Sequence, residues 1–324
     1  MKKIVIIAGP TASGKSDAAI LLSKLIGGEV ISADSMQVYK GMDIGTAKVT
    51  KEEMQGIPHH LIDVLSPFEE FNVSVFKKLA DEAIEDITLR GHIPVIAGGT
   101  GFYIQAVLYG IDFDDEASDP EYRSLLEEKA LKENGPEELY EKLKELDPAS
   151  CEKIHKNNIK RVIRALEYIH ATGEQISVHN RNEREKPPVY DAAGFFISDS
   201  RDALYERIDR RVDVMIERGL VAEVKSLLDM GVPVSSTAMQ GLGYKEIAAY
   251  LNGTIDLDEA VNRIKTGSRH FAKRQFTWFN NREDFHKIER DRYKEPGREI
   301  PEEMYRYLKD TGFIRKGESD NEMS

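Results

Sequence analysis

The first hundred residues alternate short apolar runs with amphipathic segments that have helical periodicity. The apolar runs predict strands at residues 3–8, 29–33, 60–64 and 93–98. Helical patterns lie between them at about 14–26 and 73–90. Apolar strands that alternate with helices are typical of βαβ units, so the pattern predicts an α/β fold with a parallel sheet flanked by helices.

From about residue 113 to 190, charged segments with helical periodicity replace the apolar runs. Helices are expected at 121–134, 137–146 and 158–172, before a polar, proline-bearing stretch at 180–188. A strand is expected at 194–198, and further helices at 202–218, 220–230, 243–251, 258–280 and 301–310. We predict a core of residues 1–112 and 191–316, a helical insertion domain at 113–190 and a disordered tail at 317–324.

Residues 9–16 match G-x-x-x-x-G-K-[ST], the spacing of a phosphate-binding P-loop, between the first strand and the first helix. The residues expected to bind a polyphosphate are Gly9, Pro10, Thr11, Ala12, Ser13, Gly14, Lys15 and Ser16. The glycines let backbone N–H groups turn toward phosphate oxygens at a helix N-terminus. Lys15 can reach the terminal phosphates, and the Ser16 hydroxyl can ligate Mg²⁺. The motif does not say which polyphosphate binds.

Two further segments follow predicted strands: Asp34 ends the second, and the Gly-Gly-Thr-Gly of residues 98–101 follows the fourth. Because ligands sit outside the carboxyl ends of parallel strands, we expect both segments to meet the P-loop at one crevice. Motif logic alone favours a nucleotide-dependent phosphotransferase with Asp34 or Asp63 at the metal. Candidates for an arginine lid over the phosphates are Arg123, Arg207, Arg210 and Arg211.

Charge is distributed unevenly along the chain. The net charge of −12 argues against indiscriminate nucleic-acid binding. Residues 112–147 hold 14 Asp/Glu against 5 Lys/Arg, whereas 152–186 hold 8 Lys/Arg against 5 Glu and 263–294 hold 10 Lys/Arg against 4 Asp/Glu. Two basic stretches in an acidic protein suggest a face for a nucleic acid.

A single cysteine, Cys151, excludes an intrachain disulfide and a cysteine-rich zinc module. No apolar stretch approaches the roughly 20 residues that span a bilayer. We therefore expect a cytoplasmic protein that does not enter the membrane.

Longer motifs identify a family. Residues 31–48, together with the P-loop, closely resemble the tRNA dimethylallyltransferases. Further matches lie at 56–63, 98–103, 160–167, 207–212, 243–246 and 272–279, in unbroken order over about residues 3–285. The resemblance implies a P-loop NTPase-like fold in which dimethylallyl diphosphate replaces the nucleotide. Its five-carbon group would go to N6 of the adenine 3′ of the anticodon in tRNA, and diphosphate would leave. Mg²⁺ is the implied cofactor, and we expect a monomer.

The resemblance also implies roles for single residues. Asp34 would be the base that takes the proton of the adenine amine, and Thr100 would orient that amine. Lys15 and Arg211 would stabilise the leaving diphosphate. From the sequence alone, Asp34 could instead be a metal ligand or a cap, and Thr100 could merely end a turn.

The resemblance places contacts to tRNA at Asp34, Ser35, Met36, Gln37, Thr100, Arg123, Lys160, Arg161, Arg164, Gln240, Gly243, Tyr244 and Lys245, and we expect Lys273 and Arg274, in the second basic stretch, to contact the tRNA backbone. Trp278 and Phe279 are expected in the core. His59 and His60 are adjacent on a predicted strand and would point to opposite faces, so we expect structural roles for them.

Three other functions compete. An adenylate isopentenyltransferase would prenylate AMP, ADP or ATP, but a mononucleotide needs neither the helical insertion nor the basic helix near the C-terminus. A small-molecule kinase would transfer a phosphoryl group from ATP. A non-catalytic RNA-binding protein has no need for an intact P-loop beside Asp34 and Thr100.

Overall fold

The computed structural model describes residues 1–111, 113 and 119–314, and the predicted tail at 317–324 lies outside this range. Contacts divide the chain into two compact units, residues 1–108 with 189–324 and residues 109–188. Each unit is described by itself below.

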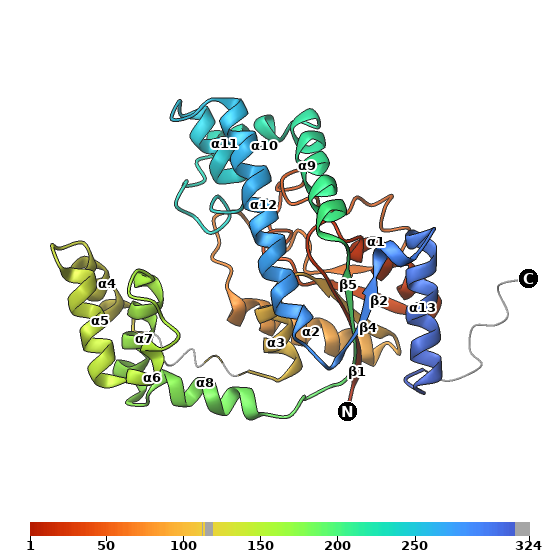
Figure 1. Ribbon diagram of the computed structural model, residues 1–324, viewed down its shortest axis with the longest axis horizontal. Coiled ribbons are helices and arrows are strands. Elements are labelled where there is room, and N and C mark those ends of the chain that lie inside the picture. Colours follow the sequence, from red (N-terminus) through yellow and green to blue (C-terminus); the bar gives the residue numbers. More distant parts are fainter. Residues whose placement is uncertain (112, 114–118, 315–324) are drawn as a thin grey trace, which may run out of the picture. The chain divides into compact units, whose positions relative to one another are not determined.

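A parallel sheet forms the centre of the larger unit (Figure 1). Within the described residues its strands are β1 (Lys3–Ala8), β2 (Gly28–Ser32), β3 (His59–His60), β4 (Ile93–Gly98), β5 (Asp191–Ser198) and β6 (Phe285–Glu289). Their order is β3-β2-β4-β1-β5-β6, and every neighbouring pair is parallel. The predicted α/β fold is confirmed, and the carboxyl ends of the strands meet at one edge.

Helices cover both faces of this sheet (Figure 1). The helices of this unit within the described residues are α1 (Lys15–Ile26), α2 (Val73–Leu89), α3 (Gly101–Leu108), α9 (Arg201–Glu217), α10 (Leu220–Asp229), α11 (Tyr244–Leu251), α12 (Leu257–Asn280) and α13 (Pro296–Asp310), with the short 3₁₀ helix η2 (Arg290–Arg292). Helices α10 and α11 pack on α9 and α12. On one face, Val5, Ile7 and Phe195 are fully buried and share a core with residues of α1 and α13. The long helix α12 packs against α9, α11 and α3, which places it over the end of the sheet that carries the P-loop.

The chain departs from the predicted elements at several points. The strand expected at 60–64 is only His59–His60, because Leu61 and Asp63 adopt left-handed backbone conformations with φ of 61° and 55°. The periodicity did not predict α3 or the edge strand β6. The buried carboxylate of Glu29 on β2 binds His60 at 2.7 Å and Arg90 at 2.8 Å. Arg90 first, and also His60, lower the pKa of Glu29 to about 2, so these groups anchor β3 beside β2.

The smaller unit is helical. It contains α4 (Pro120–Ala130), α5 (Gly135–Leu146), α6 (Pro148–Cys151), α7 (Ile159–Thr172) and α8 (Ile176–Glu185). Its own core includes Leu126, Leu139, Leu143, Val162 and Leu166. The periodicity did not predict helix α8, which includes residues 180–185 of the polar, proline-bearing stretch.

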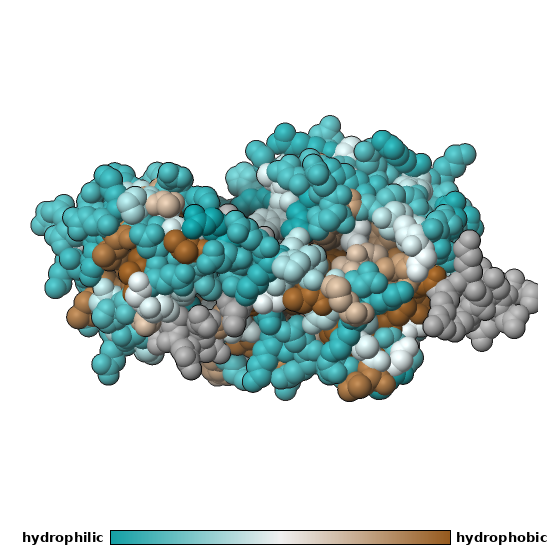
Figure 2. All heavy atoms as spheres, turned by 90° about the horizontal axis from the view of Figure 1, so that it is seen from below, coloured by the Kyte–Doolittle hydropathy of each residue, from teal (hydrophilic) through white to brown (hydrophobic). Residues whose placement is uncertain are grey.

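The face drawn in Figure 2 is mostly hydrophilic, with hydrophobic residues in several separate groups. Among the helices of the described residues, none is both long enough and apolar enough to cross a membrane.

Candidate active site

The P-loop connects β1 to α1 at the carboxyl edge of the sheet. Ala12 and Gly14 have φ of 63° and 86°, in the left-handed region. A side chain at Gly9 would meet the Ser13 hydroxyl at 2.6 Å and the Ile197 carbonyl at 2.8 Å, so only glycine fits there. This turn leads directly into the N-terminus of α1, a backbone arrangement that favours anions.

Four cations surround this loop: Lys15, Arg207, Arg211 and Arg290. Arg207 Nε donates to the Ala12 carbonyl at 3.0 Å, and Arg290 Nη1 donates to the Ser13 carbonyl at 3.3 Å. Both also bind the buried carboxylate of Asp199. Arg211 extends from α9 toward the Thr11 hydroxyl. The cations therefore fix the loop and concentrate positive charge at it.

The charged groups at the P-loop favour the binding of an anion. Burial first, and then the charge of Arg211, lower the pKa of Lys15 to about 8, although Asp34 opposes the shift. Burial also lowers the pKa of Arg211. The Ser13 hydroxyl is fully buried and has no hydrogen-bond partner among the described residues. A bound polyphosphate would relieve the crowding of these desolvated cations.

Helix α12 holds the P-loop through Gln275. The Gln275 side chain is buried, and its Oε1 accepts a hydrogen bond from the Thr11 N–H at 2.9 Å. A Cβ at Gly99 would lie 2.0 Å from Gln275 Nε2, and one at Gly101 would lie 2.1 Å from the indole of Trp278. The glycines around Thr100 therefore let α12 pack directly on the backbone that follows β4.

Asp34 lies just beyond β2 and is half-buried. Its Oδ1 accepts from the Met36 N–H at 2.9 Å and from the Gln37 N–H at 3.4 Å, so the side chain caps this turn. Among the described residues, Oδ2 has no hydrogen-bond partner. The neighbouring Gln37 was expected to contact tRNA, but its side chain is buried and bonds Ser32 at 3.0 Å and the Thr46 carbonyl at 3.3 Å. The hydrogen bonds to Oδ1 thus hold the Asp34 carboxylate in place and orient Oδ2.

A cavity of about 340 Å³ brings many predicted residues together. Those that line it are Thr11, Asp34, Ser35, Met36, Thr100, Arg211, Gln240, Gly243, Tyr244, Lys245 and Arg274. An apolar wall from α9 and α12 faces the same cavity, formed by Ile208, Val212, Met215, Ile264 and Phe271. Cationic, acidic and apolar groups therefore share one site.

Glu223 on α10 supports another wall of this cavity, which Gly45, Thr46 and Tyr244 line. Its Oε2 accepts from the N–H groups of Asp43 at 2.9 Å and Ile44 at 2.7 Å. Its Oε1 accepts from the Gly45 N–H at 3.0 Å and the Tyr244 hydroxyl at 2.6 Å. A Cβ at Gly45 would lie 2.5 Å from the Tyr244 ring. Glu223 thus fixes the loop that carries Gly45 against α11.

Several predicted tRNA contacts lie outside the cavity. Arg123 and Arg164, in the smaller unit, bind the fully buried Glu167 at 2.8 and 3.1 Å. Lys160 and Arg161 are exposed on α7, and Lys273 is exposed on α12. Of the basic residues of α7, Arg164 therefore pairs with the buried Glu167, whereas Lys160 and Arg161 lie on the surface.

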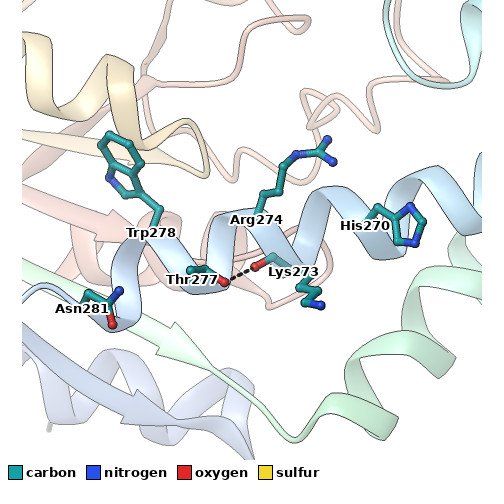
Figure 3. Close-up of a pocket in the computed structure, with 6 residues that line it drawn as sticks. All are labelled: His270, Lys273, Arg274, Thr277, Trp278 and Asn281. Carbon is teal, nitrogen blue, oxygen red and sulfur yellow. Dashed lines mark hydrogen bonds between the residues drawn. The ribbon is translucent and has the colours of Figure 1, made fainter. Parts of the chain in front are cut away.

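The prediction for the two aromatic residues of α12 is half wrong. Phe279 is buried at 1% exposure, as expected, but Trp278, shown in Figure 3, is 41% exposed. Of the paired histidines, His60 binds Glu29 and His59 bonds the Ile57 carbonyl at 2.8 Å.

Sequence reasoning missed Glu223, Gln275 and Arg290 as site residues. Gln275 lies inside the quoted motif at 272–279, which could have drawn attention to it. Nothing in the local sequence marks Glu223 or Arg290, because their partners are distant in the chain.

Known proteins share this architecture and sequence. The model of the IPP transferase family matches residues 37–282, and that of isopentenyl transferases matches residues 2–66. A tRNA dimethylallyltransferase of Lachnoclostridium phytofermentans is 54% identical, with 88% of this chain and 90% of the relative covered. Another, of Acetivibrio thermocellus, is 51% identical, with 90% and 93% covered.

Solved structures agree. A tRNA isopentenylpyrophosphate transferase of Staphylococcus epidermidis is 42% identical, with a TM-score of 0.70 over 95% of this chain and 99% of that one. A eukaryotic dimethylallyltransferase acting on tRNA is 30% identical, with a TM-score of 0.83 over 98% of this chain and 82% of that one. With most of its length matched in sequence and fold, and with a P-loop, Asp34 and Arg211 gathered at one edge of the sheet, this chain belongs to the IPP transferase family.

Proposed function

We propose that this protein transfers the dimethylallyl group of dimethylallyl diphosphate to N6 of the adenine 3′-adjacent to the anticodon of tRNA, releasing diphosphate. The observation that carries this proposal is that Thr11 of the P-loop, Arg211, the Asp34 carboxylate and an apolar wall line one cavity. Membership of the IPP transferase family supports a prenyl donor, and the names of the relatives support a tRNA acceptor.

The apolar wall favours a prenyl donor over a nucleotide. Ile208, Val212 and Met215 lie on α9, the helix that also carries Arg211. A diphosphate gripped by Arg211 and the P-loop would therefore have its hydrocarbon beside apolar side chains. A ribose in this position would bury its hydroxyl groups against side chains that offer no hydrogen-bond partner.

The chemistry follows from charge. As the bond between the allylic carbon and the diphosphate oxygen breaks, negative charge builds on that oxygen. P-loop N–H groups, Lys15 and Arg211 stabilise this charge, which lowers the barrier. The electron pair of the adenine N6 forms the new carbon–nitrogen bond, and Asp34 Oδ2 accepts the N6 proton. Thr100, on the same cavity, orients the amine.

Mg²⁺ fits the residues at the loop. The Ser16 hydroxyl stands at the position that holds this ion in P-loops. No cluster of three His, Cys, Asp or Glu occurs among the described residues, so the ion would take its other ligands from diphosphate oxygens and water, as Mg²⁺ commonly does. When bound, it would neutralise charge on the diphosphate.

The acceptor adenine must leave its stack to reach Asp34. Extrusion of a base costs a few kcal/mol, which contacts to the rest of the loop offset. We assign these contacts to Ser35, Gln240 and Lys245 at the cavity, and to Lys160 and Arg161 on the exposed face of α7. Residues 109–188 would thus serve as a tRNA-binding domain.

Labelled dimethylallyl diphosphate and Mg²⁺, offered separately with bulk tRNA, AMP and ATP, test the proposal. We expect label in tRNA alone. Label in AMP or ATP would identify an adenylate prenyltransferase, and consumption of ATP with an untouched prenyl donor would identify a kinase.

A further inference from the structure

A buried carboxylate lies at the carboxyl end of β5, next to the cations of the P-loop. The side chain of Asp199 is 3% exposed, and its Oδ1 accepts a hydrogen bond from the Ser200 N–H at 2.7 Å. Its Oδ2 binds the guanidinium of Arg207 on α9 and lies 3.8 Å from Nε of Arg290, the residue that directly follows β6. One carboxylate thus joins the ends of two neighbouring strands to α9.

The two arginines reach from this carboxylate to the backbone of the P-loop. Arg207 Nε donates to the Ala12 carbonyl at 3.0 Å, and Arg290 Nη1 donates to the Ser13 carbonyl at 3.3 Å. A Cβ at Gly14 would lie 2.5 Å from the same Arg290 nitrogen, so the guanidinium lies against the Gly14 backbone. The C=O and N–H of a planar trans peptide unit point in opposite directions. A guanidinium fixed on the Ser13 carbonyl therefore fixes the direction of the Gly14 N–H.

These groups act on the active-site cavity from outside it. Among the described residues that line the cavity are Thr11 and Arg211, but not Asp199, Arg207 or Arg290. Arg207 lies one helical turn before Arg211 on α9, and Arg211 Nη1 is 3.5 Å from the Thr11 hydroxyl. The contacts of Arg207 therefore hold both the P-loop and the helix that delivers Arg211.

The carboxylate offsets the repulsion between the two guanidinium groups. Burial first, and then the charge of Arg207, lower the pKa of Arg290, whereas Asp199 and Asp17 oppose this shift. Two like charges that bond adjacent carbonyls disfavour each other, and an opposite charge between them favours both. Asp199 is therefore the group that allows both arginines to stay charged at neighbouring carbonyls of the loop.

We infer that Asp199 is a positioning residue for the departure of diphosphate: by holding Arg207 and Arg290 at the Ala12 and Ser13 carbonyls, it keeps the N–H groups of the P-loop aimed at the charge that develops on the leaving group. This rests on the proposed function for the identity of the leaving group. A guanidinium on a carbonyl also polarises the peptide unit, which makes its N–H a stronger donor. Donors that are already in place stabilise a transition state because they need no rearrangement as the charge forms.

The affinity for inorganic diphosphate, measured by calorimetry in the presence of Mg²⁺, tests the inference by the sign of its change. Asp199→Asn keeps the shape of the side chain and removes its charge. A carboxylate that acted only as a nearby negative charge would weaken anion binding, so its removal would tighten the binding of diphosphate. Loss of a positioning residue should instead weaken it, and we expect the dissociation constant to rise about tenfold, less than when an oxyanion donor itself is removed. Tighter or unchanged binding would overturn the inference.

Prenyl transfer gives a second readout. We expect Asp199→Asn to lower kcat about tenfold while the KM for tRNA stays at the parent value, because the affected donors face the diphosphate. A fall in the amount of folded protein would lower kcat but leave the dissociation constant of diphosphate unchanged. Asp209→Asn is the matched control, since Asp209 on α9 binds Arg269 of α12 at 2.6 Å and has no bond to the P-loop among the described residues. It should leave both constants unchanged.

Arg290→Lys tests the same connection without altering the buried carboxylate, and it decides the matter if Asp199→Asn does not fold. Lysine keeps the charge but lacks the planar fork that contacts Ser13 and Asp199 together. We expect weaker diphosphate binding, and an effect in the double variant that is smaller than the product of the single effects, because the two residues act as a unit. Parent-like binding by Arg290→Lys, or effects that multiply, would contradict the inference. Failure of the parent to prenylate tRNA would overturn the proposed function, whereas the diphosphate affinities would still decide the role of Asp199.

Discussion

The side-chain oxygen of Gln275 accepts a hydrogen bond from the backbone N–H of Thr11 at 2.9 Å, across 264 residues of sequence. This bond attaches the P-loop to α12, the helix that also carries Arg274 and Trp278. The helix that holds the P-loop therefore also lines the active-site cavity, through Phe271 and Arg274. The Gly99 backbone, which leaves no room for a side chain, encloses the Gln275 amide.

Gln275→Leu should weaken donor binding selectively. The substitution leaves the Thr11 N–H, in a half-buried residue, without its partner; for a fully buried donor this loss typically costs about 1–3 kcal/mol. We expect the KM for dimethylallyl diphosphate to rise about tenfold, with little change in the affinity for an RNA hairpin whose loop carries an anticodon followed by adenine. Steady-state kinetics with each substrate varied in turn measure both. A variant that loses hairpin affinity alone would show that Gln275 does not act through the P-loop.

Asp34→Asn and Asp34→Ala together test the base. Asparagine can still accept the Met36 N–H with its Oδ1 and so preserve the cap, but it cannot take a proton. We expect Asp34→Asn to lower kcat by about 10²–10⁴ with nearly unchanged hairpin affinity. Asp34→Ala should lose both the proton acceptor and the hydrogen bonds to the Met36 and Gln37 N–H groups that cap this turn. Parent-like turnover in single-turnover assays of Asp34→Asn would remove Asp34 from the chemical step.

The lowered pKa of Lys15 predicts how donor binding depends on pH. Because its pKa is lowered to about 8, the residue loses its charge as the pH rises through that value. We therefore expect the donor KM to increase above about pH 8, and donor binding there to take up a proton. Measurement of the donor KM on both sides of this pKa checks the prediction. Lys15→Arg keeps its charge throughout, so any binding that it retains should be insensitive to pH over this range, and a flat profile for the parent would contradict the role.

The same pKa has a consequence for stability. The ordinary pKa of a lysine is 10.5, so the unfolded chain holds this proton at pH values where the folded protein has released it. The free energy of unfolding contributed by Lys15 therefore rises with pH between about 8 and 10.5. A saturating prenyl diphosphate should abolish this trend by restoring the charge.

Glu223→Gln should disorder one wall of the cavity. Glutamine has a single acceptor oxygen and places an N–H₂ group among three N–H donors and the Tyr244 hydroxyl. Hydrogen bonds to a charged group contribute about 1.5–3 kcal/mol each, so the variant should melt at a lower temperature and bind the hairpin more weakly. Tyr244→Phe removes only one of the four bonds and should have a smaller effect on both. Equal behaviour of parent and Glu223→Gln in thermal melts and hairpin binding would refute this role.

Local patterns explain why much of the fold was predictable. The strands β1 and β4 are nearly continuous apolar runs, and α1 and α2 have clear periodicity, so neighbouring residues decide these elements. Strand β6 was missed because its Phe-His-Lys-Ile-Glu sequence is half polar, as suits an edge strand with one neighbour. Its pairing with β5 depends on residues about ninety positions earlier.

The site divides in the same way. Asp34 and Thr100 follow strands, and parallel topology brings strand ends together, so their meeting could be expected. The faces of α12 could not be read from hydropathy, because the polar Gln275 is buried and Trp278 is exposed. The positions of both side chains depend on where α12 packs against the backbone of Gly99 and Gly101. Such a contact exists only once β4 and α12 are in place.

The central claim is that the P-loop holds a prenyl diphosphate rather than a nucleotide. A crystal structure of the protein grown with Mg²⁺, a non-reactive dimethylallyl thiodiphosphate and an ATP analogue at equal concentration tests it directly. We expect the thiodiphosphate between Lys15 and Arg211, with its hydrocarbon between Asp34 and Met215. The ATP analogue in that position, with its γ-phosphate at Asp34, would contradict it.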